Sequence, residues 1–277
     1  MRKYYTRACN FHYGTKAKNL IKKKLALPLC GSKSIAFENI EILSRERKKK
    51  IISIKNIQTL PKKIKKIVLI DLKKIVTKRK NLNKHINILE PVIMGVLNLT
   101  PDSFSDGGLY NHFEKAFKHT HNMICKGADI IDVGGESTRP GSKTIFHKDE
   151  WQRLKKVLYS FKKKFPKTFL SVDTRKSEVM IKAINCKSDL INDVSGFSYD
   201  QKAIEKIKNF NVWKVLHHMQ GNPNNMQIKP NYKNVLLDVY DFFEKKINTD
   251  FKNFKYKKFI IDPGIGFGKN LKHNLIL

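Results

Sequence analysis

The hydrophobic pattern after residue 90 consists of short apolar runs, each followed by a polar or glycine-rich end and then a segment of helical length. The runs are residues 91–99, 128–135, 168–174, 189–196, 212–219 and 258–264. Hydrophobic residues within each run are continuous rather than alternating, which indicates strands that are buried on both faces. Six repeats of strand and helix predict an α/β fold with parallel strands covered by helices.

Two architectures share this pattern, the open doubly wound sheet and the closed eight-unit barrel. The open sheet would concentrate its phosphate-binding glycines after the first strand and bind ligand at one switch point. Nearly every run here instead ends in Asp, Asn or His, which suits a barrel with functional groups around its carboxyl-terminal rim. We therefore expect residues 86–277 to form a TIM (β/α)8-type barrel in which about six of the eight units are present.

Residues 1–85 form a separate compositional block. Two apolar stretches, 35–43 and 49–57, flank the polar sequence SRERK, as expected for the two strands of a hairpin. Apolar residues then recur at helical spacing from Ile64 to Val76. We expect a basic α+β extension made of a hairpin and a helix, and it contains no cluster of catalytic residue types.

Charge is distributed unevenly along the chain, which has a formal net charge of +32. Lys and Arg outnumber Asp and Glu by 25 to 5 in residues 1–90 and by 31 to 19 in residues 91–277. Clustered lysines can bind nucleic acid by releasing counterions from phosphates. Here lysine is spread over the whole chain and the basic runs contain no interleaved aromatic residues, so a solvated basic surface is the favoured interpretation. Nucleic-acid binding by residues 1–85 remains a rival.

The cysteines and the short apolar runs indicate in which cellular compartment the protein resides. Cys9, Cys30, Cys125 and Cys186 have no CxxC spacing and no paired histidine pattern, so neither a zinc site nor a disulfide framework is indicated. No apolar run approaches the roughly 18 residues of a membrane span, and no apolar segment follows the positive N-terminus. We expect a reduced, cytoplasmic protein with no membrane partner.

Polar residues follow the ends of the predicted strands. They are Asn98, Asp132, Asp173, Asn192, Asp193, His217, His218 and Asp262. Each one alone is more often a turn or helix cap than a functional group. Together they should converge on one rim, because parallel strands point their carboxyl ends the same way. Carboxylates and amides at the base of such a rim suit a flat heterocycle with adjacent N–H donors, such as a guanine-like or pterin-like edge.

The loops above this base offer donors suited to a phosphate or diphosphate. They are Ser137, Thr138 and Arg139 in one loop, and Asn98, Thr100, Ser103 and Ser105 in the other. The sequence GIGFGKN at residues 264–270 is not a nucleotide-binding P-loop, because Asn270 stands where that motif requires Ser or Thr. Its glycines instead predict a tight turn that leaves Phe267 projecting over the opening.

Several of these motifs together resemble dihydropteroate synthase. They are GVLNLTPDSFSDGG, ADIIDVGGESTRPG, SVDTRKSEV, LINDVSG, HMQGNPNNMQ and IIDPGIGFGKNLKHN, and the match runs from about Pro91 to the last residue. The resemblance implies a folate-biosynthesis transferase that condenses 6-hydroxymethyl-7,8-dihydropterin diphosphate with p-aminobenzoate. The products would be 7,8-dihydropteroate and diphosphate. It also implies Mg²⁺ as cofactor and no protein nucleophile, since the arylamine attacks the substrate directly.

The resemblance also implies a role for individual residues. Asp173, Asn192 and Asp262 would hold the pterin, with Asp132 a weaker candidate beside it. Asn98 would bind diphosphate or its Mg²⁺, and Thr138 and Arg139 would bind the anion. Phe104, Pro140 and Phe267 would form the slot for the aminobenzoate ring, and Asp106 would order the opening loop. His217 takes a position that is often Met in the family, where a histidine satisfied by its neighbours and a new ligand contact are both open.

The match departs from the family at the end of the chain. The resemblance implies seventh and eighth units beyond Leu277, so we expect this chain to be a poorly stable, inactive fragment of a protein that can form a homodimer at full length. One alternative is a degenerate or truncated pterin-binding protein. Another is a pterin-binding barrel that serves methyl transfer to a corrinoid, which would have no reason to keep TPDSFSDGG and STRPG.

Overall fold

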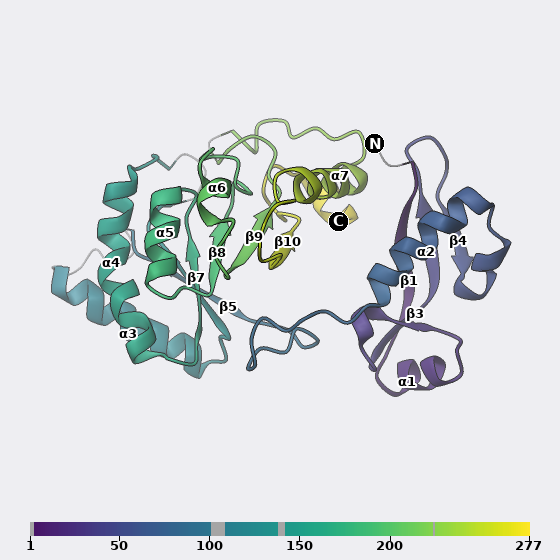
Figure 1. Cartoon of the computed structure of the whole chain (residues 1–277), viewed down its shortest axis with the longest axis horizontal. Helices are drawn as coiled ribbons and strands as arrows, with labels where there is room; N and C mark the ends of the chain where they lie inside the picture. The colour runs from purple at the N-terminus through teal and green to yellow at the C-terminus, as the bar shows by residue number, and fades with distance from the viewer. Residues whose placement is uncertain (1–2, 101–108, 138–141, 224) are drawn as a thin grey trace. The chain divides into compact units, whose positions relative to one another are not determined.

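The chain divides into two compact units, Met1–Glu90 and Pro91–Leu277 (Figure 1). The computed structural model describes residues 3–100, 109–137, 142–223 and 225–277. The division lies slightly beyond the boundary expected after residue 85. None of the described helices combines the length and the hydrophobicity that a bilayer crossing requires.

The first unit contains a four-stranded antiparallel sheet and two α-helices. Its elements are β1 (Tyr5–Tyr13), α1 (Gly14–Lys22), β2 (Leu27–Pro28), the 3-10 helix η1 (Leu29–Gly31), β3 (Ile35–Leu43), β4 (Lys50–Ser53), the 3-10 helix η2 (Ile54–Thr59) and α2 (Lys62–Val76). Strand β3 pairs antiparallel with the other three. The sequence predicted no element where β1, α1 and β2 lie.

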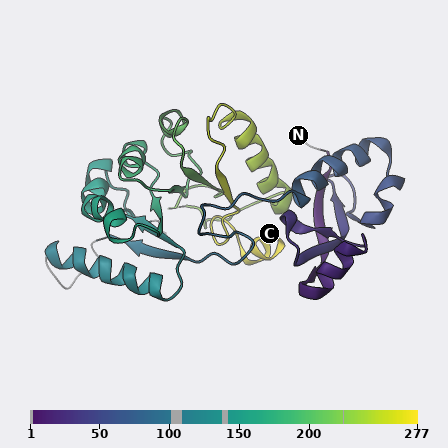
Figure 2. The same cartoon turned by 60° about the horizontal axis from the view of Figure 1, so that its bottom comes forward.

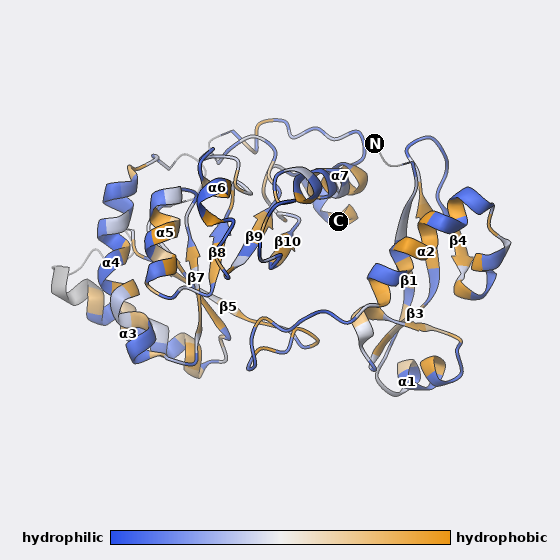
Figure 3. Cartoon of the chain, viewed as in Figure 1, coloured by the Kyte–Doolittle hydropathy of each residue, from blue (hydrophilic) through white to orange (hydrophobic). Residues whose placement is uncertain are grey.

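Helix α2 is amphipathic, as Figure 3 shows. Its buried residues Val68 and Leu72 pack in one core cluster with Phe37 and Ile40 of β3. The lysines of α2 lie mostly on its exposed side. The periodicity that predicted this helix therefore also determines which of its faces is buried.

The second unit is built on a six-stranded parallel sheet in the order β10-β9-β8-β7-β6-β5. The strands are β5 (Met94–Asn98), β6 (Ile130–Gly134), β7 (Phe169–Asp173), β8 (Leu190–Asp193), β9 (Trp213–His217) and β10 (Phe259–Asp262). The helices are α3 (Leu109–Cys125), α4 (His147–Lys164), α5 (Ser177–Asn185), α6 (Ala203–Ile207), α7 (Val235–Thr249) and α8 (Leu271–Ile276). All six predicted runs are therefore strands, and the α/β class is confirmed.

The six strands do not close into a ring. In the described part of the chain β5 and β10 each pair with a single strand, and Figure 2 shows the curved sheet between them. The prediction that both faces of every strand are buried was wrong for these two. Met94 and Val96 of β5 are 36% and 55% exposed, and Ile261 of β10 is 46% exposed. Each has a sheet neighbour on one side only, which leaves more of its surface open to solvent.

The register of the sheet separates an apolar outer face from an inner face whose residues are polar near the carboxyl ends of the strands, because alternate residues of a strand point to opposite sides. Outer-face residues pair across neighbouring strands, Leu97 with Val133 and Val133 with Val172. They form one core cluster with helix residues such as Leu154 of α4 and Phe243 of α7. Helices therefore cover the outer face, and the residues between these apolar positions lie on the inner face.

Candidate active site at the carboxyl ends of the strands

The sheet register brings the predicted strand-end residues together on the inner face. Asn98, Gly134, Asp173 and Asn192 are successive partners across β5, β6, β7 and β8. Asp132 and Ser171 pair two residues earlier on the same face, and His217 pairs with Asp262 at the ends of β9 and β10. This register continues one polar face from β5 to β10 and gathers Asn98, Asp132, Asp173, Asn192, His217 and Asp262.

Asp132 is a buried carboxylate that positions Asn192. Its oxygens accept hydrogen bonds from Ser171 Oγ at 2.5 Å and from Asn192 Nδ2 at 2.9 Å. Burial raises the pKa of Asp132 although both hydrogen bonds favour its charged form. Because the amide nitrogen of Asn192 is committed to Asp132, its Oδ1 is left as an acceptor. Asp132 thus holds the Asn192 side chain in place.

Asp173 differs from Asp132 in having no partner. Its side chain makes no hydrogen bond within the described residues and is only partly buried. Burial raises the pKa of Asp173 well above its usual value, and the nearby charges of Asp132 and Asp193 raise it further. A ligand with N–H donors would stabilise the ionised form of this carboxyl group, which only accepts hydrogen bonds.

A glycine keeps space open between Asp173 and Asn98. A Cβ atom on Gly134 would lie 3.5 Å from Asn98 Oδ1 and 3.6 Å from Asp173 Oδ2. The two oxygen-bearing side chains therefore flank a position where the chain has no side chain of its own. An amide oxygen and a carboxylate at this distance from one point can bind a small polar group or a cation.

His217 is held by the backbone on one side of its ring. Its Nδ1 lies 2.7 Å from the carbonyl oxygen of Val194, which can only accept, so the proton is on Nδ1 and Nε2 is left as an acceptor. Burial lowers the pKa of His217, although the Asp262 carboxylate counteracts it. The neighbours of His217 therefore satisfy Nδ1, while a ligand contact at Nε2 is still open.

Asp262 begins the turn that follows β10. Its Oδ1 accepts a hydrogen bond from the Gly264 amide at 2.7 Å. The turn requires left-handed backbone at Gly264, with a φ of 68°. Phe267 then packs edge-on against His217, with ring centroids 4.8 Å apart and an interplanar angle of 87°. The predicted tight turn and the position of Phe267 over the inner face are both found.

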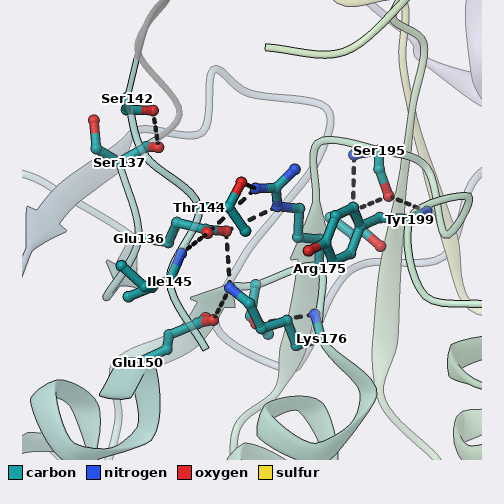
Figure 4. A network of polar contacts seen from close by, with 12 residues as sticks. Glu136, Ser137, Ser142, Thr144, Ile145, Glu150, Arg175, Lys176, Ser195 and Tyr199 are labelled. Atoms are coloured by element: carbon teal, nitrogen blue, oxygen red, sulfur yellow. Dashed lines mark hydrogen bonds and ion pairs between the residues drawn. The ribbon is translucent and has the colours of Figure 1, made fainter. Parts of the chain in front are cut away.

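A buried ionic network links residues after β6 to residues after β7, and sequence reasoning missed it (Figure 4). Arg175 donates to Glu136 from Nε at 2.8 Å and from Nη2 at 3.2 Å. Lys176 lies 3.0 Å from Glu136 and 2.6 Å from Glu150. Burial alone would raise the pKa of Glu136, but the hydrogen bonds from Arg175 and Lys176 outweigh it and the pKa is lowered. Arg175 also stacks on Tyr199, 4.1 Å from its ring centroid.

This network ties the segment after β6 to the turn after β7. Ile145, at the far end of the loop, donates its amide to Glu136 at 3.1 Å. A cavity of about 270 Å³ opens beside the network, among residues that include Thr144, Lys176 and Tyr199, and not at Asp173. The signal in the sequence was the pairing of an acidic residue in GGESTRPG with two basic residues in DTRK, on neighbouring strand ends.

Several predicted residues lie outside the described part of the chain. They are Ser103, Phe104, Ser105, Asp106, Thr138, Arg139 and Pro140. The residues on either side of 138–141 are described, and there Ser142 Oγ donates to the Ser137 carbonyl at 2.6 Å.

Comparison with known proteins identifies the family of the second unit. The family model described as "Pterin binding enzyme" matches residues 94–277. Dihydropteroate synthase of Escherichia coli K12 is 42% identical over 193 residues, which cover 69% of this chain and 68% of that protein. The chain belongs to the dihydropteroate synthase family. The resemblance seen in the motifs is thereby confirmed.

Solved structures of the family extend the likeness to the fold. The Yersinia pestis dihydropteroate synthase, solved with a sulfonamide drug, is 39% identical with a TM-score of 0.63, and the match covers 69% of each chain. The Burkholderia cenocepacia dihydropteroate synthase, complexed with 7,8-dihydropteroate, is 33% identical with a TM-score of 0.60 and covers 69% of this chain and 65% of that one. The second unit therefore has the TIM-barrel fold of the family, with its six described strands in an open sheet.

Proposed function

We propose that the second unit is the pterin-binding core of a dihydropteroate synthase. Its reaction joins 6-hydroxymethyl-7,8-dihydropterin diphosphate to p-aminobenzoate and releases diphosphate. The observation that carries the proposal is the unpartnered, partly buried Asp173 carboxyl beside the fixed Asn192 amide, on the inner face of a barrel of this family.

The pterin would lie across the inner face. Its ring edge presents adjacent N–H donors, which an ionised Asp173 can accept side by side. Asn192 Oδ1 would accept a further N–H, since Asp132 already occupies the amide nitrogen. Asp262 keeps one oxygen for the ligand, because Gly264 uses only Oδ1 among the described contacts. Each charge-assisted hydrogen bond of this kind contributes roughly 1.5–3 kcal/mol.

The anion and its metal would be held at the strand-end loops. Mg²⁺ usually keeps several waters and binds through one or two protein oxygens together with substrate phosphates. Asn98 Oδ1, beside the space at Gly134, fits such a partial site, and the described residues contain no cluster of three acidic, His or Cys ligands. Bound there with the diphosphate, Mg²⁺ would neutralise leaving-group charge. Thr138 and Arg139 would contact the same diphosphate.

The chain's own residues act mainly by positioning. The arylamine nitrogen forms a bond to the methylene carbon of the pterin substrate while the carbon–oxygen bond to diphosphate breaks, and the proton that the nitrogen then loses leaves with the diphosphate or to water. Asp173, Asn192 and Asp262 would fix the pterin, and Phe104, Pro140 and Phe267 would align the aminobenzoate ring for this attack. Arg139 would stabilise the negative charge that develops on the departing diphosphate. Asp106 would order the loop that follows β5.

We also propose that the protein is cytoplasmic and that it forms a homodimer. A cytoplasmic location is supported by the four cysteines, which are all unpaired. Homodimer formation rests on the family resemblance alone, and sedimentation velocity would measure it.

Calorimetric titration with 7,8-dihydropteroate tests the proposed function. We expect the chain to bind the compound and Asp173→Ala to weaken binding by about tenfold to a hundredfold, because one charge-assisted contact is lost. Asp149→Ala, at an exposed position in the first turn of α4, is the matched control and should bind as the unmodified chain does. Absence of binding by the unmodified chain, or equal affinity of Asp173→Ala, would contradict the proposal.

A further inference from the structure

Lys269 is a buried lysine that joins the turn after β10 to the end of β9. Its Nζ lies 3.0 Å from His218 Nδ1, 3.2 Å from the His218 carbonyl, 3.0 Å from the Gly264 carbonyl and 2.9 Å from the Phe267 carbonyl. The residue is 3% exposed. An ammonium has three N–H donors, so these four acceptors use all of them.

All four acceptors are neutral groups, and no carboxylate lies within ion-pair distance of Lys269 among the described residues. Burial lowers the pKa of Lys269 to about 8, although the charge of Asp262 acts in the opposite direction. Burying an ammonium without a counter-ion costs folding free energy. The groups that Lys269 holds in place therefore indicate its role.

Lys214 provides an internal comparison. It is fully buried, and its Nζ donates to the carbonyls of Phe210 at 3.0 Å and Tyr256 at 3.4 Å. Burial lowers its pKa to about 8, as for Lys269. Lys214 lies near the start of β9, paired with Ile191 of the outer face. The two lysines thus share their chemistry but hold opposite ends of the strand.

The turn held by Lys269 approaches β9 closely. A Cβ atom on Gly264 would lie 2.0 Å from the His218 carbonyl oxygen, and one on Gly268 would lie 2.7 Å from the Gln220 amide. Lys269 binds the Phe267 carbonyl in this turn, and the Phe267 ring stands against His217 of the inner face. The same bonds that fix the backbone therefore set the position of the aromatic ring.

We infer that Lys269 is a positioning residue: by tying the 264–268 turn to the end of β9, it holds Phe267 over His217 and so sets the affinity for the aryl half of a pteroate-type ligand. The inference rests on the proposed function, because that function assigns Phe267 to the aminobenzoate slot. It adds a residue that touches neither substrate and acts through the turn.

Two ligands separate this role from general stability. 6-Hydroxymethylpterin occupies only the pterin site, and pteroic acid adds the aminobenzoyl ring. The dissociation constant of 6-hydroxymethylpterin divided by that of pteroic acid therefore measures how much the ring slot adds to the affinity. We expect pteroic acid to bind the unmodified chain more tightly, and Lys269→Met to reduce that ratio about two- to tenfold, since a positioned aromatic contact is worth about 0.5–1.5 kcal/mol.

Lys214→Met is the matched control, because it removes a buried lysine of the same kind from the other end of β9. It should lower stability yet leave the ratio of the two dissociation constants unchanged. If Lys269→Met fails to fold, Lys269→Gln, which keeps two N–H donors, carries the same comparison with a smaller fall in the ratio. An unchanged ratio in the folded Lys269 variant would overturn the inference.

A ligand-free measurement keeps the inference separate from the proposed function. Nuclear Overhauser contacts between the rings of Phe267 and His217 should be present in the unmodified chain and in Lys214→Met, and weakened or lost in Lys269→Met. Retention of these contacts in Lys269→Met would overturn the inference. Failure of the unmodified chain to bind either pterin compound would contradict the proposed function, and the ring contacts would still decide the role of Lys269.

Discussion

Asp132 and Asp173 lie on the same face of neighbouring strands and differ in their hydrogen bonds. Asp132 is fully engaged by Ser171 and Asn192, while Asp173 has no hydrogen-bond partner in the described residues. A buried carboxylate with two donors organises its neighbours. One without donors is free to bind a ligand, and burial together with the nearby charges of Asp132 and Asp193 raises its pKa.

Asp132→Ala should cost both stability and pterin affinity. The substitution leaves the Ser171 hydroxyl and the Asn192 amide without their buried acceptor, which costs about 1–3 kcal/mol for each unsatisfied group. It also frees the Asn192 amide to rotate, so pterin binding should weaken. Urea denaturation and calorimetry measure the two effects.

Ser171→Ala is the matched control for that experiment. It removes one hydrogen bond to Asp132 but leaves the Asn192 bond, so we expect a loss of about 1 kcal/mol and little change in pterin affinity. If Asp132→Ala bound pterin as tightly as Ser171→Ala, the positioning role of Asp132 would be wrong.

Strand ends and turns carry the chemistry of the second unit, and the ionic network after β6 and β7 connects two of them. Glu136 accepts from Arg175 and from Lys176, and the latter also reaches Glu150. Removal of one partner from a buried ionic network leaves uncompensated charge, which is strongly destabilising. The network therefore fixes the base of the loop that carries Thr138 and Arg139.

Glu136→Gln should lower the affinity for the diphosphate group more than the affinity for the pterin ring. The substitution removes the charge that Arg175 and Lys176 neutralise, and we expect a loss of about 3 kcal/mol in the free energy of unfolding. Binding of the dihydropterin diphosphate should then fall, while binding of 6-hydroxymethylpterin should hold. Equal losses for the two compounds would show that the network does not act through the loop.

The sequence predicted the six strands of the second unit and the polar residues at their ends for one physical reason. Continuous apolar runs mark parallel strands, and parallel strands place Asp173 and Asn192 at one rim. The contacts of Lys269 could not be predicted, because three of its four acceptors are backbone carbonyls that carry no residue signature. Strand β1 was missed because its polar and aromatic residues give no clear alternation between Tyr5 and Tyr13.

At the scale of the whole molecule, the larger share of the net charge and the candidate site lie in different units. Residues 1–90 hold 25 of the 56 basic side chains but none of the described strand-end site. Their strands and helices form a separate core around Phe37 and Val68. The dihydropteroate synthase likeness begins only at residue 94.

Removal of residues 1–90 should leave the dissociation constant for pterin unchanged, because every residue placed in the site belongs to the second unit. Titration calorimetry of the shortened and complete chains measures this. The rival in which this unit binds nucleic acid predicts RNA binding that falls steeply with salt and disappears on removal of the unit. RNA binding that is weak and equal in both chains would eliminate that rival.

The central claim is that the Asp173 carboxylate receives the N–H donors of a pterin. Its pKa can be followed directly by ¹³C NMR of the side-chain carboxyl during pH titration, with and without bound 6-hydroxymethylpterin. We expect a pKa well above the ordinary value in the free chain, lowered when the pterin binds, because the donors stabilise the ionised form. Binding should accordingly strengthen as pH rises through the pKa of the free chain. A pKa that is the same in the free and bound chains would contradict it.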